Sequence, residues 1–171
     1  ELTFNKYALF LQTSRRFLEK RISLSAGIRT DFSDYSNDLS NPLEQLSPRF
    51  SISYMLTDRF GFNGNIGLYY QLPPYTVLGY RDSAQTLVNK ENNITYIRSG
   101  HIVAGFEYNT LKNARITVEG FYKKYDNYPF LLTDSVSLAN MGADFGVIGN
   151  EPANSSSEGR SYGLELLIQQ K

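Results

Sequence analysis

The stretch FEYNTLKNARITVEGFYKKYDNYP, residues 106–129, contains two runs of alternating apolar and polar side chains joined by a short polar link. Apolar side chains recur at nearly every second position, which is the period of a β-strand with one face in an apolar environment. A long polar segment, residues 125–161, then begins. A soluble sandwich and a membrane barrel both contain such strands, so the connections between strands have to distinguish them.

The composition limits the classes of protein that the chain can belong to. It has 171 residues, no Cys and no Trp, which excludes a disulfide scaffold and any cysteine-based zinc or redox site. Lys and Arg together number 17, as do Asp and Glu, so the chain has no excess of positive charge that would attract nucleic acid. We therefore predict no nucleic-acid partner. No apolar run reaches the roughly 20 residues of a transmembrane helix. The 13 Tyr and 11 Phe against 2 Met favour strands over helices.

The same alternation predicts further strands along the chain. Most exceed the five or six residues that are typical of globular proteins, and they suit a bilayer crossed at a tilt. The polar sides of these strands are rich in Ser, Asn and Gln, an unusual choice for a surface in bulk water. The seven predicted strands are residues 6–14, 21–30, 49–56, 60–71, 100–108, 115–124 and 162–170.

Short and long connections alternate between these strands. The short links are residues 16–20, 57–59 and 109–114, and the long ones are residues 31–48, 72–99 and 125–161. Successive turns of an antiparallel meander lie at opposite ends of the sheet, so all long links lie at one end. Unstructured loops of this length are uncommon in compact domains, whereas outer-membrane barrels have short periplasmic turns and long extracellular loops.

The predicted fold class is therefore all-β. It is an antiparallel up-and-down meander of about seven long strands, part of a transmembrane β-barrel with short periplasmic turns and long extracellular loops. The face rich in Phe, Tyr, Ile and Leu then contacts lipid. In hydrocarbon every backbone group must be paired, and the side chains that face the lipid must be apolar. The opposite face lines the lumen, and its predicted lumen-facing residues include Arg29, Asn63, Asn65, Glu107, Glu119 and Glu165.

The segment YYQLPPYTVLGYRD, residues 69–82, runs from a strand into a Pro-Pro corner. Pro cannot continue a β-ladder, so the strand ends here, and two interpretations of the tyrosines stay open. Tyr69 and Tyr70 suit an aromatic girdle at the membrane interface, while Tyr75, Tyr80 and Arg81 are predicted ligand contacts carried by an extracellular loop. Residues 151–161, EPANSSSEGRS, are of low complexity and are predicted to be mobile.

The sequence gives little sign of catalysis or metal binding. His101 is the only histidine and lies in no catalytic motif. Glu107, Glu119 and Glu165 could approach one another as glycosidase carboxylates do, but charged side chains are expected in any barrel lumen. Residues 31–38 alternate oxygen ligands without the Gly and Glu of a calcium loop. We therefore predict no enzyme activity, no metal site and no cofactor.

Five motifs in order along the chain resemble the barrel of TonB-dependent outer-membrane receptors. They lie in LSAGIRTD (24–31), LSPRFSISYMLTDRFGFNGNIGLYYQLPPY (46–75), GFEY with ITVEGFYKKYDNYP (105–108 and 116–129) and GRSYGLELLIQQ (159–170). Each motif is weak alone, but their order over nearly the whole chain makes the resemblance fairly specific. The matching residues are Gly27 and Arg29; Ser47, Pro48 and Arg49; Tyr70 and Pro73; Phe121, Tyr122, Tyr125 and Asn127; and Gly163 and Glu165.

The resemblance implies a 22-stranded barrel in the bacterial outer membrane that is plugged by an N-terminal domain. Such a receptor imports a scarce solute, such as an iron-siderophore, a cobalamin or a glycan, with energy relayed by a TonB-type protein that acts through the plug. No plug, signal peptide or energy-coupling box is recognisable. We therefore expect residues 1–171 to be one partial β-barrel domain of a larger receptor, which in isolation would self-associate through its open edges.

Three alternatives remain open from the sequence. A passive porin-like barrel would have similar strands and loops and would differ in lacking a plug. A soluble lipocalin-like ligand-binding barrel has a comparable length, but the one-sided long loops disfavour it. A barrel enzyme such as an outer-membrane lipase would depend on His101.

Overall fold

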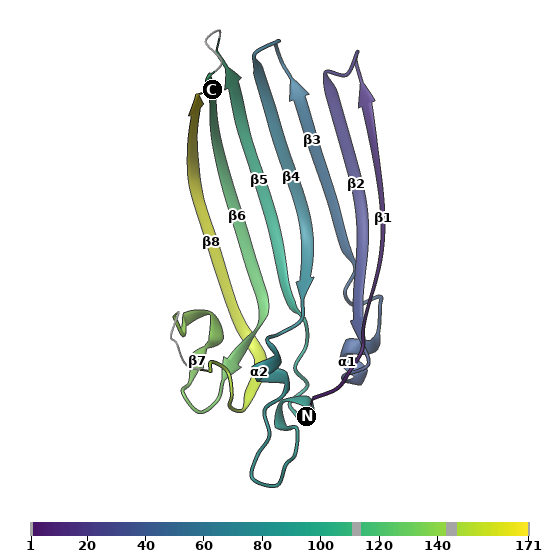
Figure 1. Cartoon of the computed structure of the whole chain (residues 1–171), viewed down its shortest axis with the longest axis vertical. Coiled ribbons are helices and arrows are strands. Elements are labelled where there is room, and N and C mark those ends of the chain that lie inside the picture. The colour runs from purple at the N-terminus through teal and green to yellow at the C-terminus, as the bar shows by residue number, and fades with distance from the viewer. Residues whose placement is uncertain (1, 111–113, 143–146, 171) are drawn as a thin grey trace.

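The computed structural model describes residues 2–110, 114–142 and 147–170, which form one curved antiparallel sheet (Figure 1). Seven long strands follow one another in chain order across it, and a short eighth strand pairs with the end of β6. The strands are β1 (Lys6–Phe17), β2 (Ile22–Ser33), β3 (Ser47–Met55), β4 (Phe60–Gln71), β5 (Ile97–Asn109), β6 (Ala114–Leu131), β7 (Val136–Ser137) and β8 (Ala153–Gln170).

The register keeps one type of side chain on each face of the sheet. Phe62 of β4 lies opposite Phe106 of β5, which lies opposite Val118 of β6. On the other face, Ser51 lies opposite Asn65. We call these the apolar face and the polar face. Since a slip of one residue would move every side chain to the other face, the apolar pattern itself fixes this register.

Side chains of the apolar face are strongly exposed. Leu11 of β1 and Leu164 of β8, the two edge strands, are 73% and 83% exposed. On the central strands, which pair on both sides, Ile66 and Ile102 are still 53% and 54% exposed. Exposed apolar area on this scale is the pattern expected of a surface that faces hydrocarbon. Aromatic pairs such as Phe60 with Phe106, whose ring centroids are 5.4 Å apart, cover part of this face.

The predicted strands are confirmed, and the largest differences in length are in β6 and β8. β6 extends to Leu131 and β8 begins at Ala153, so the two strands pair far beyond the ends of their neighbours. The prediction that residues 151–161 are mobile is therefore wrong. Polar residues there pair with β6, as in the Tyr128 and Ser157 pair. Of the short link 109–114, residues 111–113 lie outside the described part of the chain, as do residues 143–146 of the last long link.

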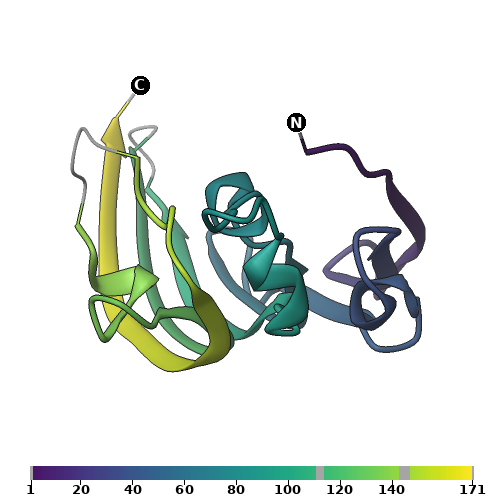
Figure 2. The same ribbon diagram turned by 90° about the horizontal axis from the view of Figure 1, so that it is seen from below.

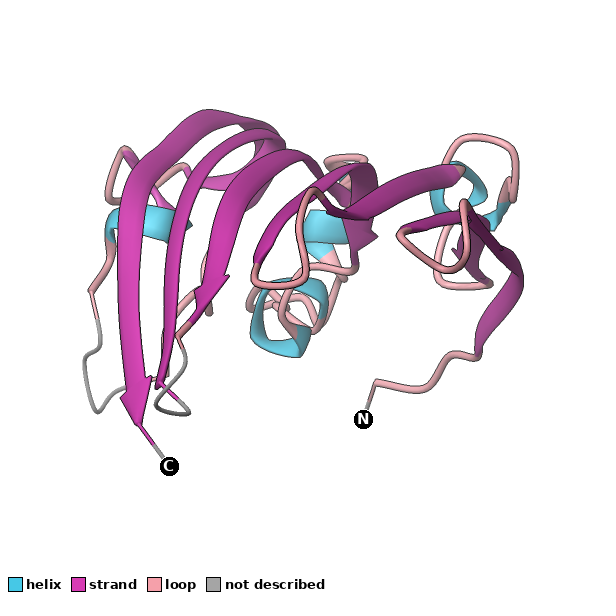
Figure 3. Ribbon diagram, turned by 90° about the horizontal axis from the view of Figure 1, so that it is seen from above, coloured by secondary structure: helices cyan, strands magenta, loops and turns pink. Residues whose placement is uncertain are grey.

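The long connections contain short elements of their own and do not remain irregular loops. These elements are α1 (Asn37–Ser40), α2 (Tyr75–Leu78), α3 (Val88–Glu91) and η1 (Leu138–Asn140). In Figures 2 and 3 the connection between β4 and β5, which carries α2 and α3 and is teal in Figure 2, lies inside the curve of the sheet. No helix in the described ranges is long and apolar enough to cross a membrane.

The buried core of the chain lies among these connections and not between the strands. We call this cluster, with the connections that carry it, the loop layer. It contains Tyr35, Leu39, Leu72, Val77, Leu78, Ile94, Tyr96, Leu131 and Ala153.

Polar side chains tie the three long connections of the loop layer together. The Tyr35 hydroxyl donates to the carbonyl of Leu78 at 2.7 Å. Asn89 is fully buried, and its amide donates to the carbonyls of Val77, at 2.7 Å, and Glu151, at 2.9 Å. The Asn89 side-chain oxygen accepts from the backbone N–H of Ala153 at 2.7 Å. Every hydrogen-bonding atom of this buried amide is used, which is what burial of a polar group requires.

Candidate functional site

A cavity of about 640 Å³ lies on the polar face, where the sheet meets the loop layer. Its wall includes Tyr69, Ser99, His101, Tyr125 and Tyr128 from the strands. Residues of β7 and η1 close another side, so the connections fold over the polar face. The volume is within the range of small-molecule sites, which are mostly apolar with a few fixed polar groups.

Gly67 makes room for the central aromatic ring of this cavity. A Cβ atom on Gly67 would lie 2.9 Å from the Tyr69 ring, so the ring folds back along β4 over this glycine. Gly67 pairs with Arg49 on one side and with His101 on the other. The Tyr69 ring therefore lies between two side chains from neighbouring strands.

Arg49, Tyr69 and His101 form a continuous stack, which we call the platform. The Arg49 guanidinium lies 4.3 Å from the centroid of the Tyr69 ring, and the Tyr69 and His101 centroids are 4.4 Å apart. Ser99 Oγ and His101 Nε2 are 2.7 Å apart, and this hydrogen bond fixes the imidazole. Lys123 lies opposite His101 on β6 and adds a second cation to this row of the sheet. The platform can offer a flat aromatic surface and positive charge to one ligand.

A β-bulge in β6 brings a further tyrosine to the cavity. Strand alternation would place Tyr125 and Tyr128 on opposite faces, but the register shifts between them, and Asn127 has a positive φ of 57°. Bulges re-aim side chains in this way, and Asn adopts the left-handed region more readily than most residues. As a result both rings line the cavity, with centroids 6.4 Å apart.

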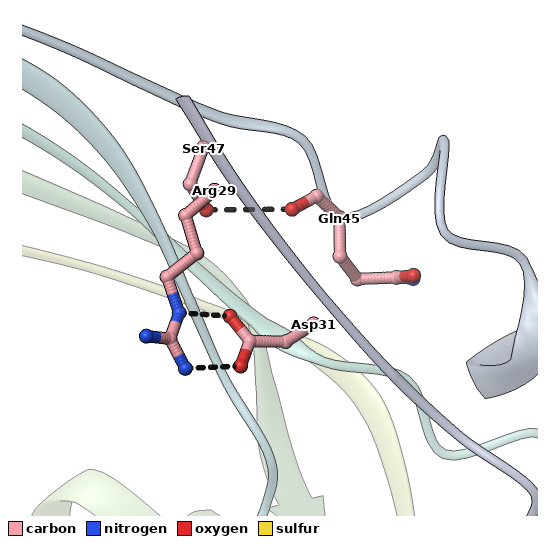
Figure 4. Close-up of polar contacts among 4 residues, drawn as sticks. All are labelled: Arg29, Asp31, Gln45 and Ser47. Carbon is pink, nitrogen blue, oxygen red and sulfur yellow. Dashed lines mark hydrogen bonds and ion pairs between the residues drawn. The ribbon is translucent and has the colours of Figure 1, made fainter. Parts of the chain in front are cut away.

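Three of the predicted lumen-facing residues lie on the polar face outside the platform. Arg29 forms a two-pronged ion pair with Asp31, at 2.6 and 2.7 Å, next to a hydrogen bond from Ser47 to the Gln45 carbonyl (Figure 4). Asn63 lies opposite Ser53, and Asn65 opposite Ser51. Asn63 and Asn65 lie closer to the short turns than the platform does, whereas Arg29 lies closer to the long connections.

The three glutamates of the polar face are not equivalent. Glu119 and Glu165 lie directly opposite each other on β6 and β8. Glu107 instead forms an ion pair with Arg115 at 2.7 Å and accepts a hydrogen bond from Asn109 at 2.9 Å. The register thus brings together two of the three.

The predicted ligand contacts Tyr75, Tyr80 and Arg81 lie in and after α2, away from the platform. Tyr75 is exposed and packs its ring edge against Phe4, with centroids 5.7 Å apart. Arg81 donates to the carbonyl of Gln85 at 2.6 Å within its own connection. None of the three is among the residues that line the 640 Å³ cavity. Their role in ligand binding stays a prediction.

The sequence does not predict the platform. By sequence Tyr69 suits an aromatic girdle, but its ring lies on the polar face beside His101. The signal that could have identified it is the repeated alternation of residues 63–71. This places Gly67 and Tyr69 on the same face as Asn63 and Asn65.

Comparison with known proteins assigns the chain to a family. Residues 1–171 match the family described as TonB dependent receptor-like, beta-barrel. No curated protein matches the chain significantly. Several solved structures share its fold, and three of them are described below.

The first of these structures is the siderophore receptor PirA from Pseudomonas aeruginosa, with a TM-score of 0.67 and 16% identity over 95% of this chain and 30% of PirA. The copper transporter OprC has a TM-score of 0.65 and 18% identity over 98% of this chain and 27% of OprC. For the alcaligin outer-membrane receptor FauA from Bordetella pertussis the TM-score is 0.59, at 14% identity over 98% of this chain and 27% of FauA.

The chain thus spans less than a third of the receptors that it matches. At these identities the likeness establishes the fold alone. The family match over all 171 residues removes the soluble lipocalin-like barrel from the alternatives. Barrels of this family lie in the outer membrane of Gram-negative bacteria, with the long connections outside and the short turns in the periplasm. The chain belongs to the family of TonB-dependent receptor β-barrels.

Proposed function

We propose that this chain forms part of the wall of an active importer, and that the platform contacts the solute on its way into the barrel. The cavity lies on the polar face at the extracellular end, where a solute enters. This position, together with the stacked Arg49, Tyr69 and His101, is the observation that carries the proposal.

The chemistry of the platform favours an anionic metal chelate as the solute. A ferric siderophore combines negative charge with flat or polarisable donor groups, which suit a guanidinium stacked on an aromatic ring. Two of the similar structures are a siderophore receptor and an alcaligin receptor, and the third is a copper transporter. A cobalamin or a glycan would use the tyrosines but not the two cations, Arg49 and Lys123.

Import against a gradient would require energy from a TonB-type protein, which acts through the plug of the whole receptor. The test uses the full receptor that contains this segment, expressed in a Gram-negative host. We expect uptake of a radiolabelled ferric siderophore to stop when the energy-coupling protein is deleted. Uptake that continues unchanged would identify a passive pore and overturn the proposal.

The platform is tested by solute affinity of the same receptor in detergent. Arg49→Gln removes the stacked cation, and we expect the affinity for an anionic ferric chelate to fall about tenfold. Cyanocobalamin, which lacks the net negative charge of such a chelate, is the comparison ligand. Arg59→Gln is the matched control, because Arg59 is an exposed cation in the turn at the periplasmic end. Equal affinity in Arg49→Gln and the control would place the solute elsewhere.

A further inference from the structure

The apolar face contains a groove that the proposed import function does not use. Its volume is about 520 Å³, and it runs across β3, β4, β5 and β6. Phe50, Ile66, Leu68, Ile102 and Tyr122 form its walls. Gly100 lies at its floor, and a Cβ atom added there would have no heavy atom within 4 Å.

Further strands of the barrel cannot cover this groove. Each of the four strands that line it is already paired on both edges within the described sheet. Only a molecule lying on the outer face of the barrel can fill it. In the membrane this molecule is a lipid or another protein.

A row of charged side chains borders the groove on its extracellular side. The apolar rows from Phe60 to Leu68 cover about 27 Å along β4, at about 3.4 Å per residue, comparable with the apolar band of outer-membrane barrels. Gly100 pairs with Leu68 and with Lys124, and Lys124 pairs with Arg160, so this cross-strand row begins apolar and ends in two cations. The groove therefore ends where hydrocarbon gives way to headgroups.

The charges of this border leave a cation available. Lys124 contacts Asp126 at 2.8 Å and Glu158 at 3.7 Å, and Arg98 also contacts Asp126, at 3.7 Å. Arg160 is exposed, and within the described part of the chain no carboxylate forms an ion pair with it. Three cations thus face two carboxylates at the top of an apolar groove.

We propose that this groove binds a phosphorylated lipid of the outer leaflet, with an acyl chain over Gly100 and a phosphate at Lys124 and Arg160. An apolar groove with a cationic end complements an acyl chain with an anionic head. Clustered Lys and Arg at a membrane surface attract anionic headgroups at about 1 kcal/mol for each cation, or about fivefold in affinity. A second protein with an apolar surface would gain nothing from the cations.

The experiment measures lipid retained by the full receptor in vesicles of phosphatidylcholine with a minority of bisphosphorylated lipid A. After extraction into a mild detergent, native mass spectrometry counts the lipid A that stays bound. We expect the double variant Lys124→Gln with Arg160→Gln to lower retention at least fivefold. Gly100→Leu, which fills the groove from its floor, should lower retention of lipid A without changing the charge.

Two control variants match these changes. Arg15→Gln removes a cation from the apolar face at the periplasmic end, because Arg15 pairs with Leu24. Ala26→Leu adds an apolar side chain to the apolar face of β2, outside the groove. Both controls should retain as much lipid A as the unmodified receptor.

Unchanged retention in the double variant, or equal loss in the controls, would overturn the proposal. If Gly100→Leu fails to fold, the double variant alone decides, because both of its positions are exposed. A change from one receptor copy to two in Gly100→Leu, at constant lipid content, would identify a protein contact and also overturn it. The solute affinity of the double variant should stay unchanged, so failure of this proposal is distinguishable from failure of the import function.

Discussion

The two ends of the chain's sheet are stabilised in different ways. In the membrane-spanning part, side chains on both faces remain accessible, and backbone pairing holds the strands together. At the loop end, three connections bury a common core and use buried polar side chains to satisfy backbone groups that no strand can pair. The strands depend on a repeating pattern, whereas the loop layer depends on individual residues.

This difference predicts where single substitutions have effects. A residue in a paired strand of the apolar face contacts surroundings that adapt, whereas a buried residue of the loop layer fits one site. Substitutions in the loop layer should therefore change local stability more than comparable substitutions in the strands.

The largest effect is expected at Asn89. Asn89→Ala removes three hydrogen bonds, and the Ala153 N–H and the Glu151 carbonyl lose these partners, at a cost of about 3 kcal/mol to the loop layer. The Val77 carbonyl keeps its 3.4 Å bond from the Tyr80 N–H. Hydrogen exchange of the full receptor should then lose protection in residues 76–79 and 150–154, while β3 and β4 keep theirs. Asn140→Ala, at an exposed position, is the control. Equal protection in Asn89→Ala and the control would contradict a shared core.

Two buried tyrosines give a matched pair for the next comparison. Tyr35→Phe removes the bond to Leu78 and should cost about 1 kcal/mol. The Tyr96 hydroxyl is buried and has no partner among the described residues, so Tyr96→Phe should be neutral or slightly stabilising. Local hydrogen exchange at residues 33–40 and 94–97 measures both. Similar losses of protection in the two variants would show that the hydrogen bond of the Tyr35 hydroxyl does not stabilise the loop layer.

The same tyrosines make the loop layer sensitive to alkali. Burial raises the pKa of Tyr35 and that of Tyr96 to about 12, above the usual value of 10.0. Each hydroxyl keeps its proton when folded, so the contribution to stability is complete below about pH 10 and is lost as the pH rises through about 12. Proteolysis of the connections should accelerate across that interval. The double Tyr35→Phe, Tyr96→Phe receptor should lose most of this acceleration.

A smaller effect is expected at the bulge, where the strand region meets the loop layer. Asn127→Val places a β-branched residue at a φ of 57° and should cost about 1 to 2 kcal/mol, whereas Asn127→Gly should be tolerated. Loss of the bulge would turn Tyr128 away from the cavity, so the Val variant should also bind solute more weakly. Equal solute affinity in both variants would show that the bulge does not position Tyr128.

The strands were predictable because alternation is local and a membrane imposes it on every strand. The residues of β8 from Ala153 to Ser161 were not, because ANSSSEGRS has no apolar alternation. Their extended conformation comes from pairing with β6, for example Ala153 with Leu131. The extended conformation of this segment is thus determined by its pairing partner β6 and not by its own sequence.

The site was predictable as a face but not as a cluster. Alternation places Arg29, Asn63 and Asn65 on one face of the sheet, and their role as lumen-facing residues stays a prediction. The platform depends on Gly67 letting the Tyr69 ring lie across it, which is a contact between three strands. The core of the loop layer likewise joins residues as far apart as Tyr35 and Leu78.

The smallest effect is expected for an ion pair at the turn end. Arg21 and Asp58 are 3.7 Å apart, and the Asp58 side chain is 95% exposed, so Asp58→Ala should change the free energy of unfolding by less than about 0.5 kcal/mol. Asp31→Ala removes the two-pronged pair with Arg29 at 2.6 Å, where the carboxylate is 17% exposed, and should cost about 1 kcal/mol. Denaturant unfolding of the full receptor compares the two. If Asp58→Ala lowered the free energy of unfolding more than Asp31→Ala, a carboxylate at the periplasmic turns would contribute more than one near the loop end. That result would contradict the view that individual side chains contribute more to stability toward the loop end.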